Sequence, residues 1–176
     1  DDLSIESKML QSDILNNMGL CYMKKDQFDL AQQDILSSIK IIEEFEEKIK
    51  DRDISKFYNY SNLGQVFRRK GDLDKALEVY TNAINQLLQY EQSGYMINNN
   101  QKSLLYNGRA NIYRDLGLKN NSKEYHKLAL EDYEAALTII ESLNNSSQDM
   151  RFLATLYSNT ATIYQNIFED KKAAQP

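Results

Sequence analysis

The sequence has few of the residues that interrupt helices. Among its 176 residues there are six glycines and one proline, Pro176 at the end. Proline removes a backbone donor, and glycine costs about 1 kcal/mol relative to alanine inside a helix. Their scarcity favours an all-helical fold before any pattern is considered. A composition of 41% hydrophobic and 27% charged residues is that of a globular protein with a core.

Cysteine and histidine are also scarce. One cysteine, Cys21, excludes an internal disulfide and a thiolate cluster, and we expect it to be a small buried thiol in a reducing compartment. One histidine, His126, excludes paired-histidine zinc sites, and we expect it on the surface. The sequence has no glycine-rich phosphate loop. We therefore predict no enzyme activity, no cofactor and no metal site.

Long apolar runs and an excess of positive charge are missing as well. No segment approaches the roughly 18 apolar residues of a membrane span, and the acidic start is unlike a signal peptide. The net charge of −5 argues against binding nucleic acid, which requires a basic face. We expect a cytoplasmic protein without membrane or nucleic-acid partners. Because the chain begins without Met, we also expect a fragment of a larger protein.

What the sequence does contain is an internal repeat. Four segments have a large residue, a Gly or Ala four positions later, and an aromatic residue three further on: 15–22, 60–67, 106–113 and 157–164. Their small residues are Gly19, Gly64, Ala110 and Ala161, at intervals of 45, 46 and 51. A second pattern follows the first three segments, at Ala31, Ile35 and Ser38, at Ala76, Tyr80 and Ala83, and at Ala129, Tyr133 and Ala136.

These patterns predict two antiparallel helices in each repeat. A small residue on either helix allows the other to approach closely, and aromatic side chains fill the holes beside it. Gly71 and Gly117 stand where the hairpins are expected to turn, since glycine commonly follows a helix end.

The pattern resembles the tetratricopeptide repeat family. The clearest repeat carries Tyr60, Leu63, Gly64, Phe67, Gly71, Ala76, Tyr80 and Ala83. Intervals longer than 34 residues, the missing proline and the triplet Asn62-Leu63-Gly64 make it similar to the long-repeat branch, such as kinesin light chains and LGN/Pins adaptors. The resemblance implies an all-α, right-handed superhelix of three hairpins plus one further helix. Its repeats would span 5–50, 52–94, 97–143 and, incompletely, 147–176 of a single domain.

Two departures from the usual repeat concern helix length. Without a proline stop, second helices are expected to run longer, as from Phe28 to about Lys50. In repeat three, Gly117 to Ala129 is seven residues longer than Gly71 to Ala76, which is close to two helical turns. The second helix is therefore expected to begin early, capped by Asn121 or Ser122, with 119–127 projecting. A disordered loop is the alternative.

In this family the first helices line a concave groove, and the resemblance implies that asparagines there hold a peptide. Asn17, Asn62 and Asn159 occupy one repeat position, and each amide can donate to and accept from a peptide backbone. Repeat three has Gly108 at that position, so Asn107 or Asn111 would substitute. Alternatively, these asparagines are polar surface residues or stabilise neighbouring helices.

A basic cluster accompanies the asparagines. Arg68, Arg69 and Lys70 lie in repeat two, and Arg109 and Arg114 lie in repeat three. Guanidinium groups suit an acidic peptide, whereas ordinary ion pairs with Asp72, Asp74 or Asp115 are the alternative. The predicted peptide-binding residues are Asn17, Asn62, Gln65, Arg68, Arg69, Asn107, Asn111, Arg114 and Asn159.

We therefore predict an adaptor or scaffold module that binds an extended or helical, acidic segment of another protein in its groove. The basic clamp of chaperone-tail binders is missing, because its positions hold Asn16, Leu104 and Gly108. The rival is a structural subunit of a large permanent assembly, or a dimer through the uncapped C-terminal helix and its Phe168–Gln175 tail, in either case with no ligand in the groove. A regulatory domain beside an enzyme is a third reading. Abundant Asn, Ile, Lys and Tyr suggests an AT-rich protozoan genome and a cytoskeletal or ciliary location.

Overall fold

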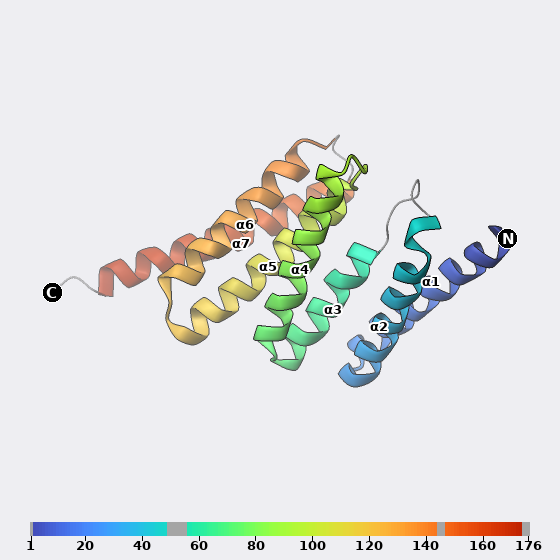
Figure 1. Cartoon of the computed structure of the whole chain (residues 1–176). Coiled ribbons are helices and arrows are strands. Elements are labelled where there is room, and N and C mark those ends of the chain that lie inside the picture. Colours follow the sequence, from blue (N-terminus) through green and yellow to red (C-terminus); the bar gives the residue numbers. More distant parts are fainter. Residues whose placement is uncertain (1, 49–55, 144–146, 174–176) are drawn as a thin grey trace. The chain divides into compact units, whose positions relative to one another are not determined.

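A computed structural model describes residues 2–48, 56–143 and 147–173, and these are entirely helical apart from turns. The helices are α1 (Asp2–Lys24), α2 (Phe28–Phe45), α3 (Lys56–Lys70), α4 (Leu73–Gln92), α5 (Asn99–Asn120), α6 (Lys123–Glu141) and α7 (Ser147–Ala173), and a 3₁₀ turn (Glu46–Lys48) follows α2. The predicted fold of three helical hairpins plus one helix is confirmed (Figure 1). The chain divides into two compact units, Asp1–Ile97 and Asn98–Pro176. None of the described helices is long and apolar enough to cross a membrane.

The first unit contains the hairpins α1–α2 and α3–α4, and α3 packs against both helices of the first hairpin. The small residues lie where the helices approach most closely. A Cβ on Gly19 would lie 2.5 Å from Cγ1 of Ile35, and a Cβ on Gly64 would lie 2.4 Å from Cε2 of Tyr80. The predicted close packing around these glycines is confirmed.

Tyr80 is the largest side chain in the core of the first unit, and it is 1% exposed between Ala76 and Ala83, which are fully buried. Its hydroxyl donates to the backbone oxygen of Ser61 at 2.9 Å. Burial raises the pKa of Tyr80 to about 12, although the bond to Ser61 and the charge of Arg68 oppose the shift. The second helix therefore contributes the large side chain at this crossing, and Gly64 on the first helix makes room for it.

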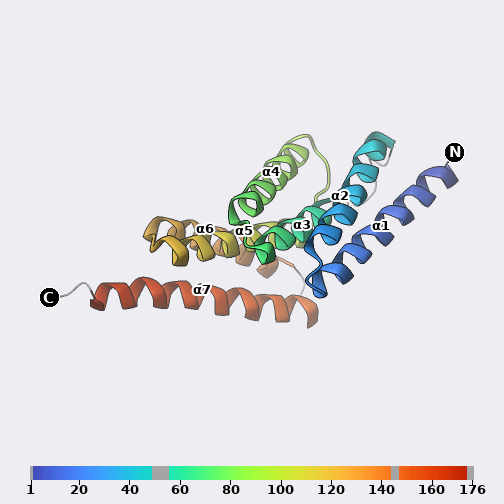
Figure 2. The ribbon, with the colours of Figure 1, turned by 90° about the horizontal axis from the view of Figure 1, so that it is seen from below.

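The second unit contains the hairpin α5–α6 and the helix α7, which lies along one side of that hairpin (Figure 2). Alanines, aliphatic side chains and one tyrosine from the three helices form its core. The buried members are Ala110, Ala129, Tyr133, Ala136, Ile140, Leu156 and Ile163. The repeat pattern predicted from the sequence therefore marks the core of this unit as well.

The turns agree with the sequence in one hairpin and correct it in another. Gly71 has φ +84° between α3 and α4, as predicted, and Asp26 adopts φ 58° at the same point of the first hairpin. Gly117 does not turn the chain: it lies inside α5, where a Cβ would be 2.4 Å from Cδ2 of His126. The turn residue is Asn121 with φ 49°, and Asn tolerates this left-handed conformation better than most residues. His126 is 6% exposed, so its expected surface position is wrong.

The insertion in repeat three is helical, but both helices share it. Helix α5 runs ten residues past Ala110, whereas α3 runs six past Gly64, so the first helix gains four residues. Helix α6 begins six residues before Ala129, whereas α4 begins three before Ala76, so the second helix gains three. Asn121 ends α5, and Ser122 precedes α6 without a side-chain capping bond. The prediction that the second helix alone takes the insertion is wrong.

Three further expectations need correction. Helix α2 ends at Phe45 rather than near Lys50, and Lys50 itself lies outside the described residues. Helix α7 continues to Ala173, so the residues from 168 to 173 belong to a helix rather than a tail. Cys21 is exposed, not buried, because α1 turns that side chain away from α2.

Candidate protein-binding surface

The predicted peptide-binding residues divide between the two units, and all of them lie on first helices. In the first unit Asn17, Gln65 and Arg69 are exposed, and Asn62 and Arg68 are half-buried. In the second unit all four predicted residues are half-buried; they are Asn107, Asn111, Arg114 and Asn159.

Asn62 links two first helices in the first unit. Its Nδ2 donates to Oδ1 of Asn16 at 3.0 Å, which joins α3 to α1. This bond uses one amide proton of Asn62 for helix packing, which is the role that the sequence left open as the alternative to peptide binding. Asn16 was not predicted as a site residue, although it stands one position before Asn17.

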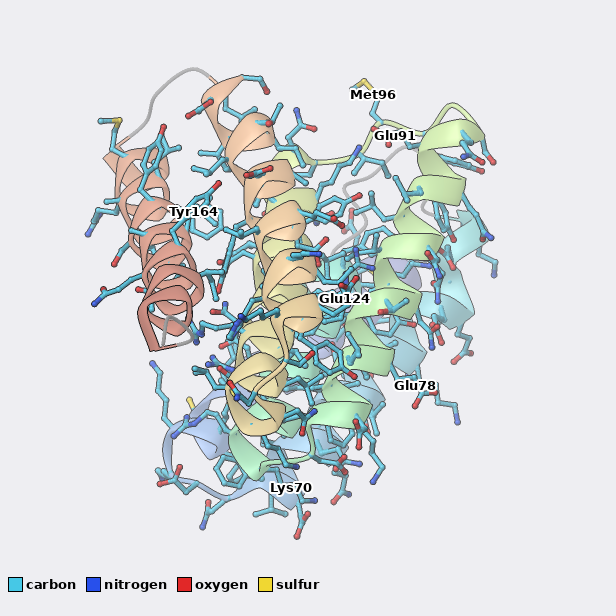
Figure 3. The ribbon with its side chains drawn as sticks, turned by 90° about the vertical axis from the view of Figure 1, so that its left-hand side faces the viewer. Lys70, Glu78, Glu91, Met96, Glu124 and Tyr164 are labelled. Carbon is cyan, nitrogen blue, oxygen red and sulfur yellow. The ribbon has the colours of Figure 1, made fainter. Side chains whose placement is uncertain are left out.

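The basic residues at the end of α3 contact the first hairpin. Arg69 donates to the backbone oxygen of Met23 at 2.8 Å and to Asp26 at 2.7 Å. Lys70, at the end of α3 in Figure 3, pairs with Asp29 at 2.5 Å. Both basic side chains remain more than a third exposed, so these are surface ion pairs of modest strength.

Asp72 was an expected partner for this basic cluster, but it serves another purpose. It precedes α4 and accepts a hydrogen bond from the backbone N–H of Lys75 at 3.4 Å. The ammonium group of Lys75 lies 2.8 Å from the carboxylate, and this side-chain hydrogen bond lowers the pKa of Asp72. Asp72 therefore caps a helix rather than neutralising the arginines.

In the second unit the predicted residues form one hydrogen-bond network. The hydroxyl of Tyr133 donates to Oδ1 of Asn111 at 2.9 Å, and Nδ2 of Asn111 donates to the backbone oxygen of Asn107 at 2.8 Å. Arg114 donates to the Tyr133 hydroxyl at 3.4 Å and to Oδ1 of Asn159 at 3.3 Å. The structure thus brings together four predicted residues from α5 and α7 around a tyrosine of α6.

One acceptor in this network is unsatisfied. Oδ1 of Asn107 is buried and makes no hydrogen bond to any residue that the structure describes. Leaving a buried acceptor unpaired costs about 1–3 kcal/mol. A ligand N–H would pair with this oxygen, and recover that free energy, only if the Asn107 side chain turned outward.

Arg109 was expected in the basic cluster but belongs to the interior of the third hairpin. It forms a two-pronged ion pair with Asp132 on α6, at 2.7 and 2.8 Å, and the two side chains are 17% and 7% exposed. Burial raises the pKa of Asp132, and the guanidinium of Arg109 opposes that shift. The guanidinium also lies 5.8 Å from the ring centres of Tyr106 and Tyr113. Its role in the hairpin is structural.

Comparison with known proteins identifies the repeat. One tetratricopeptide repeat family model matches residues 60–92, and a second matches residues 12–45 and 104–131, which together make more than half of the chain. The chain belongs to the tetratricopeptide repeat family. Repeats of this family are in general non-enzymatic modules for protein–protein interaction, so the chain is a protein-interaction module of this kind.

Curated relatives and a solved structure agree with this assignment. The chain is similar to the BBSome complex member BBS4 of Bos taurus, at 35% identity over 80 residues, and of Mus musculus, at 32% over 80 residues. The match covers 44% of this chain and 13% of each relative. The crystal structure of BtubC (BKLC) from P. vanneervenii superposes with a TM-score of 0.66 at 18% identity, over 92% of this chain and 58% of that one. That likeness supports the α-solenoid fold.

Proposed function

We propose that this tetratricopeptide module holds an extended segment of a partner protein along polar side chains of its first helices. The observation that carries the proposal is the gathering of Asn107, Asn111, Arg114 and Asn159 on α5 and α7. It includes a buried oxygen, Oδ1 of Asn107, that bonds to none of the residues the structure describes. We call these four residues the α5–α7 polar row.

The chemistry of this row suits a peptide backbone. An extended peptide presents N–H and C=O groups in alternation, and asparagine amides can pair with both. Arg114 contacts Asp115 and Asn159 only at 3.3 Å, which is longer than a good charge-assisted bond. An acidic side chain of the partner would therefore replace weak contacts with a stronger one.

The first unit offers a second set of similar residues. Asn17 and Gln65 are exposed, and Asn62, which holds the same repeat position as Asn17, is bonded to Asn16. Arg68 and Arg69 would add positive charge for an acidic segment, at the expense of the existing pairing of Arg69 with Asp26.

Binding to immobilised random peptides, with acidic and neutral sets compared, tests this function. We expect the chain to select peptides, to prefer the acidic set, and to lose affinity as salt rises. Asn107→Ala with Arg114→Gln should weaken binding about tenfold or more, since two hydrogen bonds are lost. The control is Asn82→Ala, on the exposed side of the second helix α4. Equal binding by all variants would contradict the proposal.

The open face of α7 supports a second candidate function, which is self-association. Tyr157 and Tyr164 are 54% and 44% exposed, and Ala161 between them is exposed. Figure 3 shows Tyr164 on α7, and its hydroxyl lies 3.4 Å from Glu134 of α6. The matching Gly64 and Ala110 are buried in their own hairpins. Sedimentation at increasing concentration should show a dimer that Tyr157→Glu abolishes and Asn82→Ala leaves intact; a monomer at every concentration would refute this candidate.

A further inference from the structure

The side of α1 that faces away from α2 is apolar and open. Leu10, Ile14 and Met18 recur every four residues along one face of the helix, and they are 61%, 51% and 42% exposed. Beside them is a hollow of about 420 Å³ lined by Ile14, Asn17, Met18, Cys21, Tyr22 and Lys25. We call the six residues that line this hollow the α1 open face.

Each residue of the α1 open face has a counterpart exactly one repeat, or 45 residues, later on α3. The counterparts are Asn59, Asn62, Leu63, Val66, Phe67 and Lys70. They form the surface by which α3 docks onto the first hairpin. Leu63 and Val66 are 3% and 0% exposed, and Lys70 pairs with Asp29 of α2.

The polar counterparts contact the first hairpin in the same way. Nδ2 of Asn59 donates to Oγ of Ser38 at 2.7 Å, and Asn62 donates to Asn16. The same repeat positions on α7 are Leu156 and Ile163, which are fully buried in the core with α6. In α3 and α7 alike, this face is therefore covered by the hairpin before it.

We propose that the α1 open face docks one further helical hairpin of the same repeat type, which lies against α1 as the first hairpin lies against α3. The residues of the face specify this occupant. Lys25 is the counterpart of Lys70, so the occupant should have an acidic residue at the position that Asp29 holds in the first hairpin. Ile14 replaces Asn59, so the occupant should be apolar where α2 has Ser38. Asn17, the counterpart of Asn62, calls for an acceptor at the position of Asn16.

This inference uses a surface apart from the α5–α7 polar row, so either proposal can fail alone. Of the second set in the first unit, the docked hairpin would cover Asn17. A peptide strand needs hydrogen-bond partners for its backbone groups, and the apolar side chains of Ile14 and Met18 on this face offer none. A helical occupant with its own apolar stripe matches the spacing of Leu10, Ile14 and Met18. A second copy of the chain is the competing occupant.

Cys21 provides the test, because it lies on the face and is the only cysteine. Its counterpart Val66 is fully buried under the first hairpin. In a tandem duplication of residues 11–55, residue 55 of the leading copy is followed by residue 11 of the trailing copy, so an extra hairpin precedes α1. The leading copy would carry Cys21→Ser, which leaves one thiol in the chain, and Ser38→Ala, which places an apolar residue against Ile14. We expect Cys21 in the trailing copy to react with a maleimide about tenfold more slowly than in the native chain.

Two matched variants complete the experiment. Met18→Glu in the trailing copy should restore fast reaction, because its counterpart Leu63 is buried. The control is Leu36→Cys combined with Cys21→Ser, placed in the trailing copy or in the native chain. Leu36 is 44% exposed on α2, so this thiol should react at the same rate with and without the duplication. An extra hairpin that stays unfolded by circular dichroism, or leaves Cys21 as reactive as before, would overturn the proposal. The proposal would also be overturned if Cys21 of the native chain became protected as the protein concentration rose and Met18→Glu removed that protection. The occupant would then be a second copy of the chain.

Discussion

At the scale of single residues, glycine at the helix crossing limits what the hairpin tolerates. Gly64→Ala would gain up to about 1 kcal/mol of helix propensity. The new methyl group would, however, press on the ring of Tyr80, which is 1% exposed and cannot move outward. We expect the clash to prevail and the free energy of unfolding in urea to fall by about 1–2 kcal/mol.

A double-mutant cycle separates this clash from other effects. In a Tyr80→Leu background the ring is gone, so Gly64→Ala should cost much less or become stabilising. An equal loss in both backgrounds would show that crowding by Tyr80 is not the cause.

The buried hydroxyl of Tyr80 makes stability depend on alkaline pH. Unfolded tyrosine ionises near pH 10, whereas the pKa of Tyr80 in the folded chain is about 12. Between these values the unfolded state has lost the proton that the native state keeps, so stability falls as pH rises, by about 1.4 kcal/mol per pH unit.

Urea titrations between pH 9 and 12 measure this contribution. Tyr80→Phe should lower stability by about 1 kcal/mol at pH 7, because the bond to Ser61 is lost. Above pH 10, stability should fall less steeply in Tyr80→Phe than in the parent. Parallel curves for the two proteins would contradict the assignment.

At the scale of the helix pair, the ion pair of Arg109 and Asp132 joins α5 to α6 inside the third hairpin. Arg109→Met would leave the buried carboxylate without its partner, and we expect a loss of about 3–5 kcal/mol. Replacing both residues, with Arg109→Met and Asp132→Leu, should recover most of this loss, because two apolar side chains pack without a desolvation cost. Urea denaturation of the three variants gives the answer. A double variant as unstable as the single one would disprove this account.

The shared insertion of the third hairpin should be removable as a unit. Deleting 117–120 from α5 together with 123–125 from α6 shortens both helices at the turn. Helix α5 then ends six residues past Ala110 and α6 begins three before Ala129, which are the spacings of Gly64 in α3 and Ala76 in α4, and the buried faces keep their register. We expect a folded chain that unfolds cooperatively, with slightly less helical signal in circular dichroism. Deleting 117–120 alone should be far more damaging, because it leaves α6 three residues too long at the turn. Similar damage from both deletions would contradict a shared insertion.

At the scale of the whole molecule, the fold could be predicted from the sequence because closely packed helices require particular residue types where they cross. Gly64 opposite Tyr80 needs a missing side chain on one helix and a large one on the other. Gly117 was misassigned because glycine also ends helices. The signal that identifies it is its position seven residues after Ala110, two turns along the same face of α5.

Polar partners were harder to predict than the fold. Whether an asparagine faces a ligand or a neighbouring helix depends on distances of a few ångströms, as with Asn62 and Asn16. Lys56 shows the same limit: it begins α3 like a solvated residue, yet it is 2% exposed and pairs with Glu46 and Tyr90. Repeat patterns specify faces of helices, whereas such pairs depend on rotamers that the sequence does not record.

The tyrosine–glutamate bonds between successive hairpins have a consequence for recombining them. Tyr60 donates to Glu43 at 2.6 Å, and Tyr157 donates to Glu141. The two tyrosines hold the same repeat position, and each glutamate stands twelve residues after the first alanine of its second helix, Ala31 or Ala129. The junction after α2 and the junction after α6 thus use equivalent hydrogen bonds. In a shortened chain in which α7 directly follows the first hairpin, Glu43 would already be in place to accept the hydrogen bond of the Tyr157 hydroxyl.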